Sequence, residues 1–154
     1  MNEAMKNLLT RRSVRKYKPE QITDEELRAV LEAGTYAPTA RGTQSPLIVA
    51  VQNAEDIALM SRLNAAVWGR ADFDPFFGAP TVVVVFAQAG NVNGVQDASL
   101  VMGNLLNAAH ALGLGSCWIN RAREVFEMPE GKALLKKWGV EGDWVGVGLS
   151  LIHI

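Results

Sequence analysis

The chain has 154 residues, of which 49% are hydrophobic and 20% are charged, and its formal net charge is −1 at pH 7. This balance is typical of a soluble globular domain and argues against binding to nucleic acid or an anionic membrane through bulk charge. One cysteine and two histidines are too few for an intramolecular disulfide or a typical Cys/His zinc site. Because the N-terminus lacks an apolar signal-peptide core and no apolar run approaches the roughly 18 residues of a membrane span, we expect a cytoplasmic protein.

Helices and strands alternate along the first half of the chain. After a short helix over residues 3–10, a second helix starts at Thr23, because Thr23 and Glu26 have the spacing of a capping box, and it ends near Gly34. A β-branched strand is expected over residues 47–51 and a helix over residues 55–68. The continuously apolar residues 81–86 predict a strand that is covered on both faces.

The second half contains the longest predicted helix, residues 95–112, with one apolar side made of Leu100, Val101, Leu105, Ala108 and Leu112. Strands over residues 116–119 and 144–149 flank a further helix over residues 129–138. The pattern predicts an α+β or α/β sandwich, in which helices cover the faces of a sheet. No glycine-rich dinucleotide or Walker motif follows a strand, which disfavours a Rossmann or P-loop site.

A basic run from Arg11 to Lys18 is the first segment that could carry chemistry. Five of its eight residues are cationic and none is acidic. The forked donors of arginine suit an oxyanion, so Arg11, Arg12 and Arg15 with the Ser13 hydroxyl could surround a phosphate. A solvated basic turn is the alternative, since charge runs usually lie at the surface.

The second segment is the loop over residues 36–46, where two prolines and a glycine hold the chain in shape. It offers neutral donors and acceptors without a nucleophile–base pair, namely Thr39, Thr43, Gln44 and Ser45. Such groups suit the edge of an uncharged heteroaromatic ring better than acyl transfer. An ordinary polar connection is the alternative.

The third segment runs from Gly113 to Asn120. Its glycines allow the backbone to come close to a flat ligand, and the strand beyond presents main-chain N–H groups. Cys117 has no histidine near it in sequence, so a buried packing cysteine is a better interpretation than a nucleophile. Trp118 is likewise better interpreted as a core residue than as a residue that stacks on a cofactor.

In their order and spacing, these three segments resemble the nitroreductase family over nearly the whole chain, to about Gly148. The resemblance implies one domain over residues 1–148 with an α+β sandwich fold. Its central sheet would be mixed but mainly antiparallel and flanked by helices. Two chains would form an intertwined homodimer, with FMN bound noncovalently at each subunit interface.

The resemblance also implies roles for individual residues. The FMN phosphate and ribityl chain would be bound by Arg11, Arg12, Ser13 and Arg15. The loop that reaches the flavin from the partner subunit would contribute Pro38, Thr39 and Gln44. Asn64 would lie near the flavin ring. The segment along the ring would consist of Cys117, Trp118, Ile119 and Asn120.

The function implied by the resemblance is that of an NAD(P)H-dependent flavin oxidoreductase with a ping-pong mechanism. NADH or NADPH would deliver hydride to the flavin and leave, and a nitroaromatic, quinone or similar acceptor would then take the electrons. No protein acid or base is required for hydride transfer, which agrees with the absence of a convincing catalytic dyad. The alternatives are a flavin-binding sensor or carrier without turnover and an anion-binding domain unrelated to flavin.

Two further segments stand outside the three motifs. Residues 68–77 are either a lid over the flavin, with Phe73, Phe76 and Phe77 as walls, or a loop anchored in the core by its aromatic side chains. Residues 149–154, Leu-Ser-Leu-Ile-His-Ile, stand where family members continue with a Gly-Tyr turn and a basic tail. This hexapeptide is the translation of CTG TCT CTT ATA CAC ATC, which resembles a transposon end used in sequencing libraries. We therefore expect residues 149–154 to be a non-native, adapter-derived tail.

Overall fold

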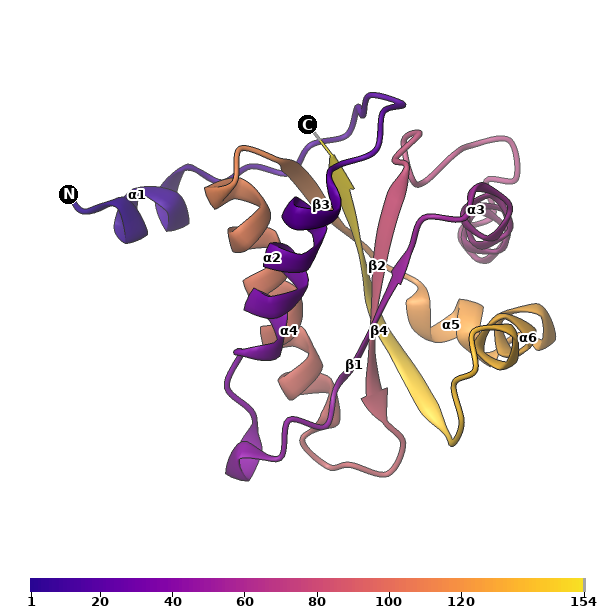
Figure 1. Cartoon of the computed structure of the whole chain (residues 1–154). Helices are drawn as coiled ribbons and strands as arrows, with labels where there is room; N and C mark the ends of the chain where they lie inside the picture. Colours follow the sequence, from indigo (N-terminus) through magenta and orange to yellow (C-terminus); the bar gives the residue numbers. More distant parts are fainter. Residues whose placement is uncertain (154) are drawn as a thin grey trace.

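A computed structural model describes residues 1–153, and Ile154, the last residue of the predicted tail, lies outside the described residues. Within the described part of the chain, four strands form one sheet with the order β1-β2-β4-β3. Each neighbouring pair is antiparallel, and the parallel contact is an isolated bridge between Ser13 and Ser116. Helices cover both faces of this sheet (Figure 1). The predicted α+β sandwich with a mainly antiparallel sheet is therefore confirmed.

The elements follow one another in the order helix α1 (Glu3–Thr10), α2 (Asp24–Thr35), the 3-10 turn η1 (Ala40–Gly42), strand β1 (Leu47–Val51), α3 (Ala54–Trp68), β2 (Thr81–Gln88), α4 (Gly94–Ala111), β3 (Gly115–Ile119), α5 (Ala122–Glu127), α6 (Pro129–Lys137) and β4 (Trp144–His153). The sequence did not predict α5, since six residues are too few to form a clear amphipathic pattern. Among residues 1–153, no helix is long and apolar enough to cross a membrane.

Strand β2 occupies the middle of the sheet and separates two hydrophobic cores. Val82, Val84 and Phe86 point toward α3, α5 and α6, whereas Val83 and Val85 point toward α2 and α4. All five side chains are completely buried, as predicted for a strand covered on both faces. Each such side chain contributes about 1.5–3 kcal/mol when it is buried, so β2 is the apolar centre of the domain.

Helix α4 buries a different face from the one that the sequence predicted. Val101 and Leu105 are buried as expected, but Leu100 and Leu112 are 49% and 43% exposed. The buried face instead includes Ala98, Met102 and Ala109. Helix α2 packs closely on this face, because a Cβ added at Gly34 would lie 2.8 Å from a methyl group of Leu105.

The start of α2 has the capping box that its sequence predicts. The Thr23 amide donates to Glu26 Oε1 at 2.9 Å, and the Glu26 amide donates to Thr23 Oγ1 at 3.1 Å. Two backbone amides that have no partner inside the helix are thereby satisfied. The helix continues one residue beyond the predicted end, Gly34, and its C-cap is Tyr36.

Strand β4 extends four residues beyond its predicted end at Leu149. The segment Leu149–His153 lies between β2 and β3 and pairs with both, as at Leu151, which faces Val82 on one side and Cys117 on the other. The side chains of Leu149, Leu151 and Ile152 are fully buried. The boundary that the sequence placed after residue 148 therefore falls inside a strand.

Candidate functional site

The basic segment after α1 runs along the outer edge of β3. Besides the bridge between Ser13 and Ser116, the Val14 amide donates to the Ser116 carbonyl at 2.9 Å. The Tyr17 hydroxyl donates to the Val14 carbonyl at 2.5 Å and so links two residues of the same segment. This pairing brings Arg15 to the segment Cys117–Asn120, so two of the three predicted motifs meet in one chain.

A cavity of about 160 Å³, here called the β3 pocket, lies where these two motifs meet. Its walls come from the basic segment, the end of α3, the following loop and the end of β3. The lining residues are Arg15, Trp68, Pro75, Phe77, Cys117, Trp118, Ile119, Asn120 and Arg121. Two of them are arginines and none is acidic, so the pocket favours an anionic or electron-rich ligand.

Asn64 supports this pocket from behind. Its side chain is completely buried, its Nδ2 donates to the Asn120 carbonyl at 2.8 Å, and its Oδ1 accepts from Arg121 Nε at 2.7 Å. Both ends of the amide are thus engaged with the turn that follows β3. The structure brings Asn64 to the predicted site, where it holds Asn120 and Arg121 in place.

Successive side chains of β3 point into opposite cores. Cys117 and Ile119 belong to the core beneath α3 and α5, and Cys117 is only 2% exposed. Trp118 packs into the other core, where its indole N–H is buried without a hydrogen-bond partner among residues 1–153. The interpretation of Cys117 as a buried packing cysteine agrees with this placement.

Tyr17 lies next to the same strand. Burial raises the pKa of its phenol above the ordinary value, the nearby Cys117 raises it further, and Arg15 opposes the shift. The hydroxyl therefore stays protonated at neutral pH and remains a donor to the Val14 carbonyl.

Arg11 and Arg12 differ in how their guanidinium groups are engaged. Arg12 Nη1 donates to the carbonyls of Leu9 and Arg11, at 3.2 and 2.9 Å, and so satisfies the end of α1. Arg11 Nη1 is buried and has no hydrogen-bond partner in the described part of the chain. A buried cationic donor without an acceptor is costly, so this atom favours an oxyanion ligand. Ser13 is exposed on the same segment.

The glycines before β3 are explained by the packing of the chain itself. Gly113 has a φ of +78° and ends α4, a conformation that L side chains rarely adopt. A Cβ on Gly115 would lie 2.9 Å from both the His153 carbonyl oxygen and Val14 Cγ2. The close approach that the sequence assigned to a flat ligand is made, at Gly115, by neighbouring segments of the same chain.

The loop with Pro38, Thr39 and Gln44 is not part of the β3 pocket in one chain. It lies at the opposite end of the sheet from residues 11–18, near the start of β1 (Figure 1). The Thr39 hydroxyl donates to Gln44 Oε1 at 2.5 Å, and Gln44 Nε2 donates to the Thr35 carbonyl at 2.7 Å. Asp97 Oδ1 on α4 accepts from the Ala40 amide at 3.0 Å. These bonds hold the shape of the loop.

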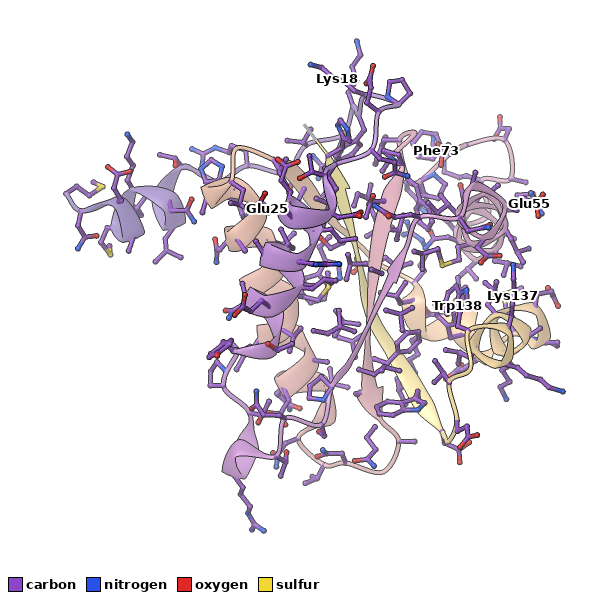
Figure 2. All side chains as sticks on the ribbon, viewed as in Figure 1. Lys18, Glu25, Glu55, Phe73, Lys137 and Trp138 are labelled. Carbon is purple, nitrogen blue, oxygen red and sulfur yellow. The ribbon has the colours of Figure 1, made fainter. Side chains whose placement is uncertain are left out.

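Residues 68–77 combine the two interpretations made from the sequence. Phe76 is 1% exposed and anchors the segment in the core, whereas Phe77 lines the β3 pocket. The rings of Trp68 and Phe73, and those of Phe73 and Phe77, meet edge to face with centroids 5.4 and 5.7 Å apart. Phe73 lies in the loop beside α3 (Figure 2). The segment is therefore an aromatic wall with one core anchor.

Arg121 is a residue of the pocket that the sequence analysis missed. Its guanidinium carbon lies 4.3 Å from the centroid of the Trp68 ring, and burial lowers the pKa of the group while Glu124 opposes the shift. It belongs to none of the three motifs, and it meets Asn64 across 57 residues of sequence. Its position directly after the predicted strand, next to Asn120, was the one available signal.

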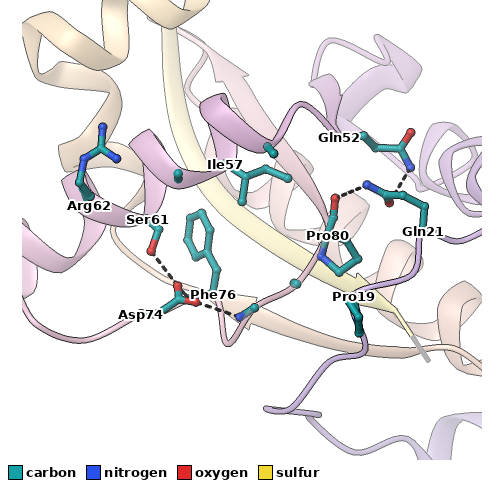
Figure 3. Close-up of a pocket in the computed structure, with 13 residues that line it drawn as sticks. Pro19, Gln21, Gln52, Ile57, Ser61, Arg62, Asp74, Phe76 and Pro80 are labelled. Carbon is teal, nitrogen blue, oxygen red and sulfur yellow. Dashed lines mark hydrogen bonds between the residues drawn. The ribbon is translucent and has the colours of Figure 1, made fainter.

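A larger cavity, about 520 Å³, lies elsewhere, between α3 and the segments around Gln21 and Pro80 (Figure 3). None of the predicted site residues lines it. Several of its polar side chains already bind one another or the backbone: Ser61 donates to Asp74, and Gln21 donates to the Pro80 carbonyl. The groove therefore offers few free polar groups, and the β3 pocket is the better candidate site.

Comparison with known proteins gives the family of this chain. A family model described as "Nitroreductase family" matches residues 8–149. A protein of Archaeoglobus fulgidus whose name includes the words NAD(P)H nitroreductase is 34% identical over 122 residues, which cover 77% of this chain and 68% of that protein. An NADPH-flavin oxidoreductase of Vibrio harveyi is 29% identical over 153 residues, covering 88% of this chain and 63% of the relative.

Solved structures show the same fold. The crystal structure of a nitroreductase with bound FMN from Bacteroides fragilis superposes with a TM-score of 0.91 and 28% identity, over 99% of this chain and 88% of that one. An FMN-dependent nitroreductase from Clostridium difficile superposes with a TM-score of 0.87 at 24% identity, over 99% and 90% of the two chains. With the family model covering most of its length, the chain belongs to the nitroreductase family.

Proposed function

We propose that this protein is an FMN-dependent oxidoreductase that takes electrons from NADH or NADPH and passes them to nitroaromatic, quinone or similar acceptors. Membership of the nitroreductase family supports the proposal, as do the relatives named for NAD(P)H and flavin. The observation that carries it is the gathering of Arg15, Asn64 and Cys117–Asn120 at one pocket beside β3. These residues come from three separate parts of the chain.

The residues of the basic segment fit the phosphate of FMN. Arg11 Nη1 is a buried donor without an acceptor, and a phosphate oxygen would satisfy it. Arg12 and Ser13 are exposed on the same segment, and Arg15 continues it into the β3 pocket. We assign the phosphate and ribityl chain to these four residues and the flavin ring to the pocket with Asn64, Cys117, Trp118, Ile119 and Asn120.

When bound, FMN supplies the hydride-accepting and electron-donating chemistry of the reaction. The chain's own residues position and shield that chemistry. Asn64 fixes the turn at Asn120, so the backbone along the pocket wall is held rigidly. Trp68 and Phe77 form an aromatic wall of the pocket. We propose that the electron donor and the acceptor bind in turn, which is ping-pong kinetics.

We further propose that the active form is a homodimer in which Pro38, Thr39 and Gln44 reach the flavin of the partner subunit. In one chain this loop lies at the opposite end of the sheet from the basic segment, so it can act only on a second copy (Figure 1). Light scattering of the FMN-loaded protein should give twice the mass of the chain. A monomer with full activity would contradict this part of the proposal.

The proposal is tested by the absorbance of the purified, FMN-loaded protein under anaerobic conditions. Addition of NADH or NADPH should bleach the flavin bands, and a nitroaromatic or quinone should restore them. A protein that binds FMN but is not bleached would be a sensor or carrier. A protein that never takes up FMN would be an anion-binding domain.

Substitution of Arg11 tests the phosphate contact separately. Arg11→Gln should weaken FMN binding by about tenfold to a hundredfold, the effect of one hydrogen bond to a charged group, and should leave riboflavin binding unchanged. Arg123→Gln is the matched control, because Arg123 is exposed and pairs only with Glu127 within residues 1–153.

A further inference from the structure

The loop over residues 74–78 separates two cavities, and its residues alternate between them. Pro75 and Phe77 line the β3 pocket. Asp74, Phe76 and Gly78 line the larger groove beside α3. Phe76 is buried and anchors the middle of the loop in the core. Because cavities rather than packed side chains lie on both sides of the other residues, the shape of the loop depends on hydrogen bonds more than that of a core segment does.

The carboxylate of Asp74 accepts three hydrogen bonds that fix this loop. Oδ1 accepts from the Phe76 amide at 2.9 Å and from the Ser61 hydroxyl of α3 at 2.7 Å. Oδ2 accepts from the Gly78 amide at 2.9 Å. In Figure 3 dashed lines join Asp74 to Ser61 and to the backbone of the loop. Two of the three donors belong to the residues on either side of Phe77, so one side chain fixes both neighbours of Phe77 and ties them to α3.

Phe77 has a backbone conformation that needs such support. Its φ is +51°, in the left-handed region that a residue with a bulky side chain rarely adopts. A conformation of this kind persists only where the surrounding structure enforces it. Here it directs the Phe77 ring into the wall of the β3 pocket, where the ring meets Phe73 edge to face with centroids 5.7 Å apart. The hydrogen bonds to Asp74 therefore hold an unfavourable backbone in place, and with it the direction of the ring.

We propose that Asp74 is a positioning residue for the cofactor, because its carboxylate holds the Phe77 ring at the flavin site. The inference rests on the proposed function, which assigns the β3 pocket to the flavin ring. Asp74 lines the groove and not the β3 pocket, so it acts on the flavin through Phe77. Contacts between aromatic rings depend on their relative orientation, so a turn of Phe77 weakens its contact with a planar cofactor.

Titration of the full-length apoprotein with FMN and with riboflavin tests the proposal. Asp74→Ala should raise both dissociation constants by about twofold to tenfold, the effect of one aromatic contact, and should change the visible circular dichroism of the bound flavin. The factor should be the same for both flavins, because the ring and not the phosphate loses a contact. Arg11→Gln, in contrast, should weaken only the binding of FMN.

Two further variants grade the effect. Asp74→Asn keeps an oxygen that accepts from Ser61 and Phe76 but loses the acceptor for Gly78, so its flavin affinity should lie between those of wild type and Asp74→Ala. Asp72→Ala is the matched control. Asp72 is exposed two residues earlier in the chain and forms no hydrogen bond or ion pair within residues 1–153. Its replacement should leave both dissociation constants unchanged.

A double-mutant cycle shows whether Asp74 acts through Phe77. Phe77→Ala removes the ring and should raise both flavin dissociation constants by a similar factor. In the protein that already carries Phe77→Ala, Asp74→Ala should have no further effect on flavin binding. Two effects that multiply would overturn the proposal, since Asp74 would then act on the flavin site by another route. If Asp74→Ala does not fold, the same cycle is carried out with Asp74→Asn.

Anaerobic reduction of the bound flavin separates this inference from the proposed function. If NADH or NADPH bleaches the flavin but Asp74→Ala binds it as tightly as wild type does, the inference fails and the proposed function stands. If flavin binding depends on Asp74 as expected but the flavin is not bleached, the proposed function fails and the inference stands. A protein that takes up neither FMN nor riboflavin would overturn both. An effect of Asp74→Ala on FMN alone would assign Asp74 to the phosphate end of the cofactor and overturn the inference.

Discussion

Asp56 joins two helices that lie far apart in the sequence, and its replacement gives a quantitative test of the packing. Asp56 is 6% exposed in the first turn of α3, and its carboxylate accepts hydrogen bonds from the last residue of α6 and from the C-cap residue of that helix. Lys137 Nζ lies 2.6 Å from Oδ1, and Trp138 Nε1 donates to Oδ2 at 3.0 Å. Figure 2 shows Lys137 and Trp138 on the side of α6 that faces α3.

The two interactions differ in the stability they contribute. The Lys137 side chain is 56% exposed, so its ion pair contributes about 0–1 kcal/mol after screening by solvent. The Trp138 bond to a charged acceptor contributes about 1.5 kcal/mol, and without Asp56 the indole N–H loses its partner. Asp56→Ala should therefore lower the free energy of unfolding by about 2 kcal/mol, a decrease in Tm of about 4–8 °C for a domain of this size. Asp56→Asn should cost less, because an amide oxygen still accepts one bond.

The effect should depend on pH in a known direction. Hydrogen bonds from Lys137 and then Trp138 lower the pKa of the Asp56 carboxyl below its ordinary value of 3.8, and burial opposes the shift. A carboxyl whose pKa is lower in the folded state stabilises the fold above its unfolded pKa. That contribution is lost as the pH falls through the folded pKa. The advantage of wild type over Asp56→Asn should therefore be complete at pH 7 and shrink below about pH 3.8.

Thermal unfolding followed by circular dichroism, at fixed protein and FMN concentrations, measures these differences, because bound ligand also shifts Tm. Glu55→Gln is the matched control: it removes the same charge from the neighbouring exposed position of α3. It should change the unfolding free energy by no more than about 0.5 kcal/mol. Two results would refute the reasoning. One is an equal loss of unfolding free energy in Asp56→Ala and Glu55→Gln. The other is a stability difference between wild type and Asp56→Asn that is the same at pH 3 and pH 7.

Three other outcomes are expected from the packing. Gly131→Ala would place a Cβ 2.0 Å from the Val125 carbonyl oxygen, so it should destabilise the protein by about 1–3 kcal/mol, and an unchanged Tm would contradict the contact. Asp97→Ala removes the buried acceptor of the loop amide and should speed trypsin cleavage after Arg41 by roughly tenfold, with Asp97→Asn intermediate; equal cleavage rates would argue against the anchor. Cys117 is 2% exposed and should react with a thiol reagent only after denaturation, so rapid labelling of the folded protein would be inconsistent with its burial.

Local features of the sequence predicted most of the secondary structure. The capping box at Thr23 and the apolar run at Thr81–Phe86 act over a few neighbouring residues, so their physical cause is visible in the sequence itself. Helix α5 is too short to show a clear pattern in the sequence, so it was missed. The end of β4 was misplaced because it depends on distant residues. Strand β4 continues to His153 because β2 and β3 supply partners on both sides, and such pairing is set by distant parts of the chain.

For the candidate site, too, some features could be predicted from the sequence and others depended on the tertiary structure. By itself the sequence determined the class of fold, the three motifs and the family they resemble, because these depend on residue types at short spacing. Only the tertiary structure decided that Asn64 and Arg121 meet across 57 residues, and that Arg15 but not Thr39 shares their pocket. The physical reason is that the basic segment pairs with the edge of β3. This pairing brings side chains that are distant in the sequence next to one another.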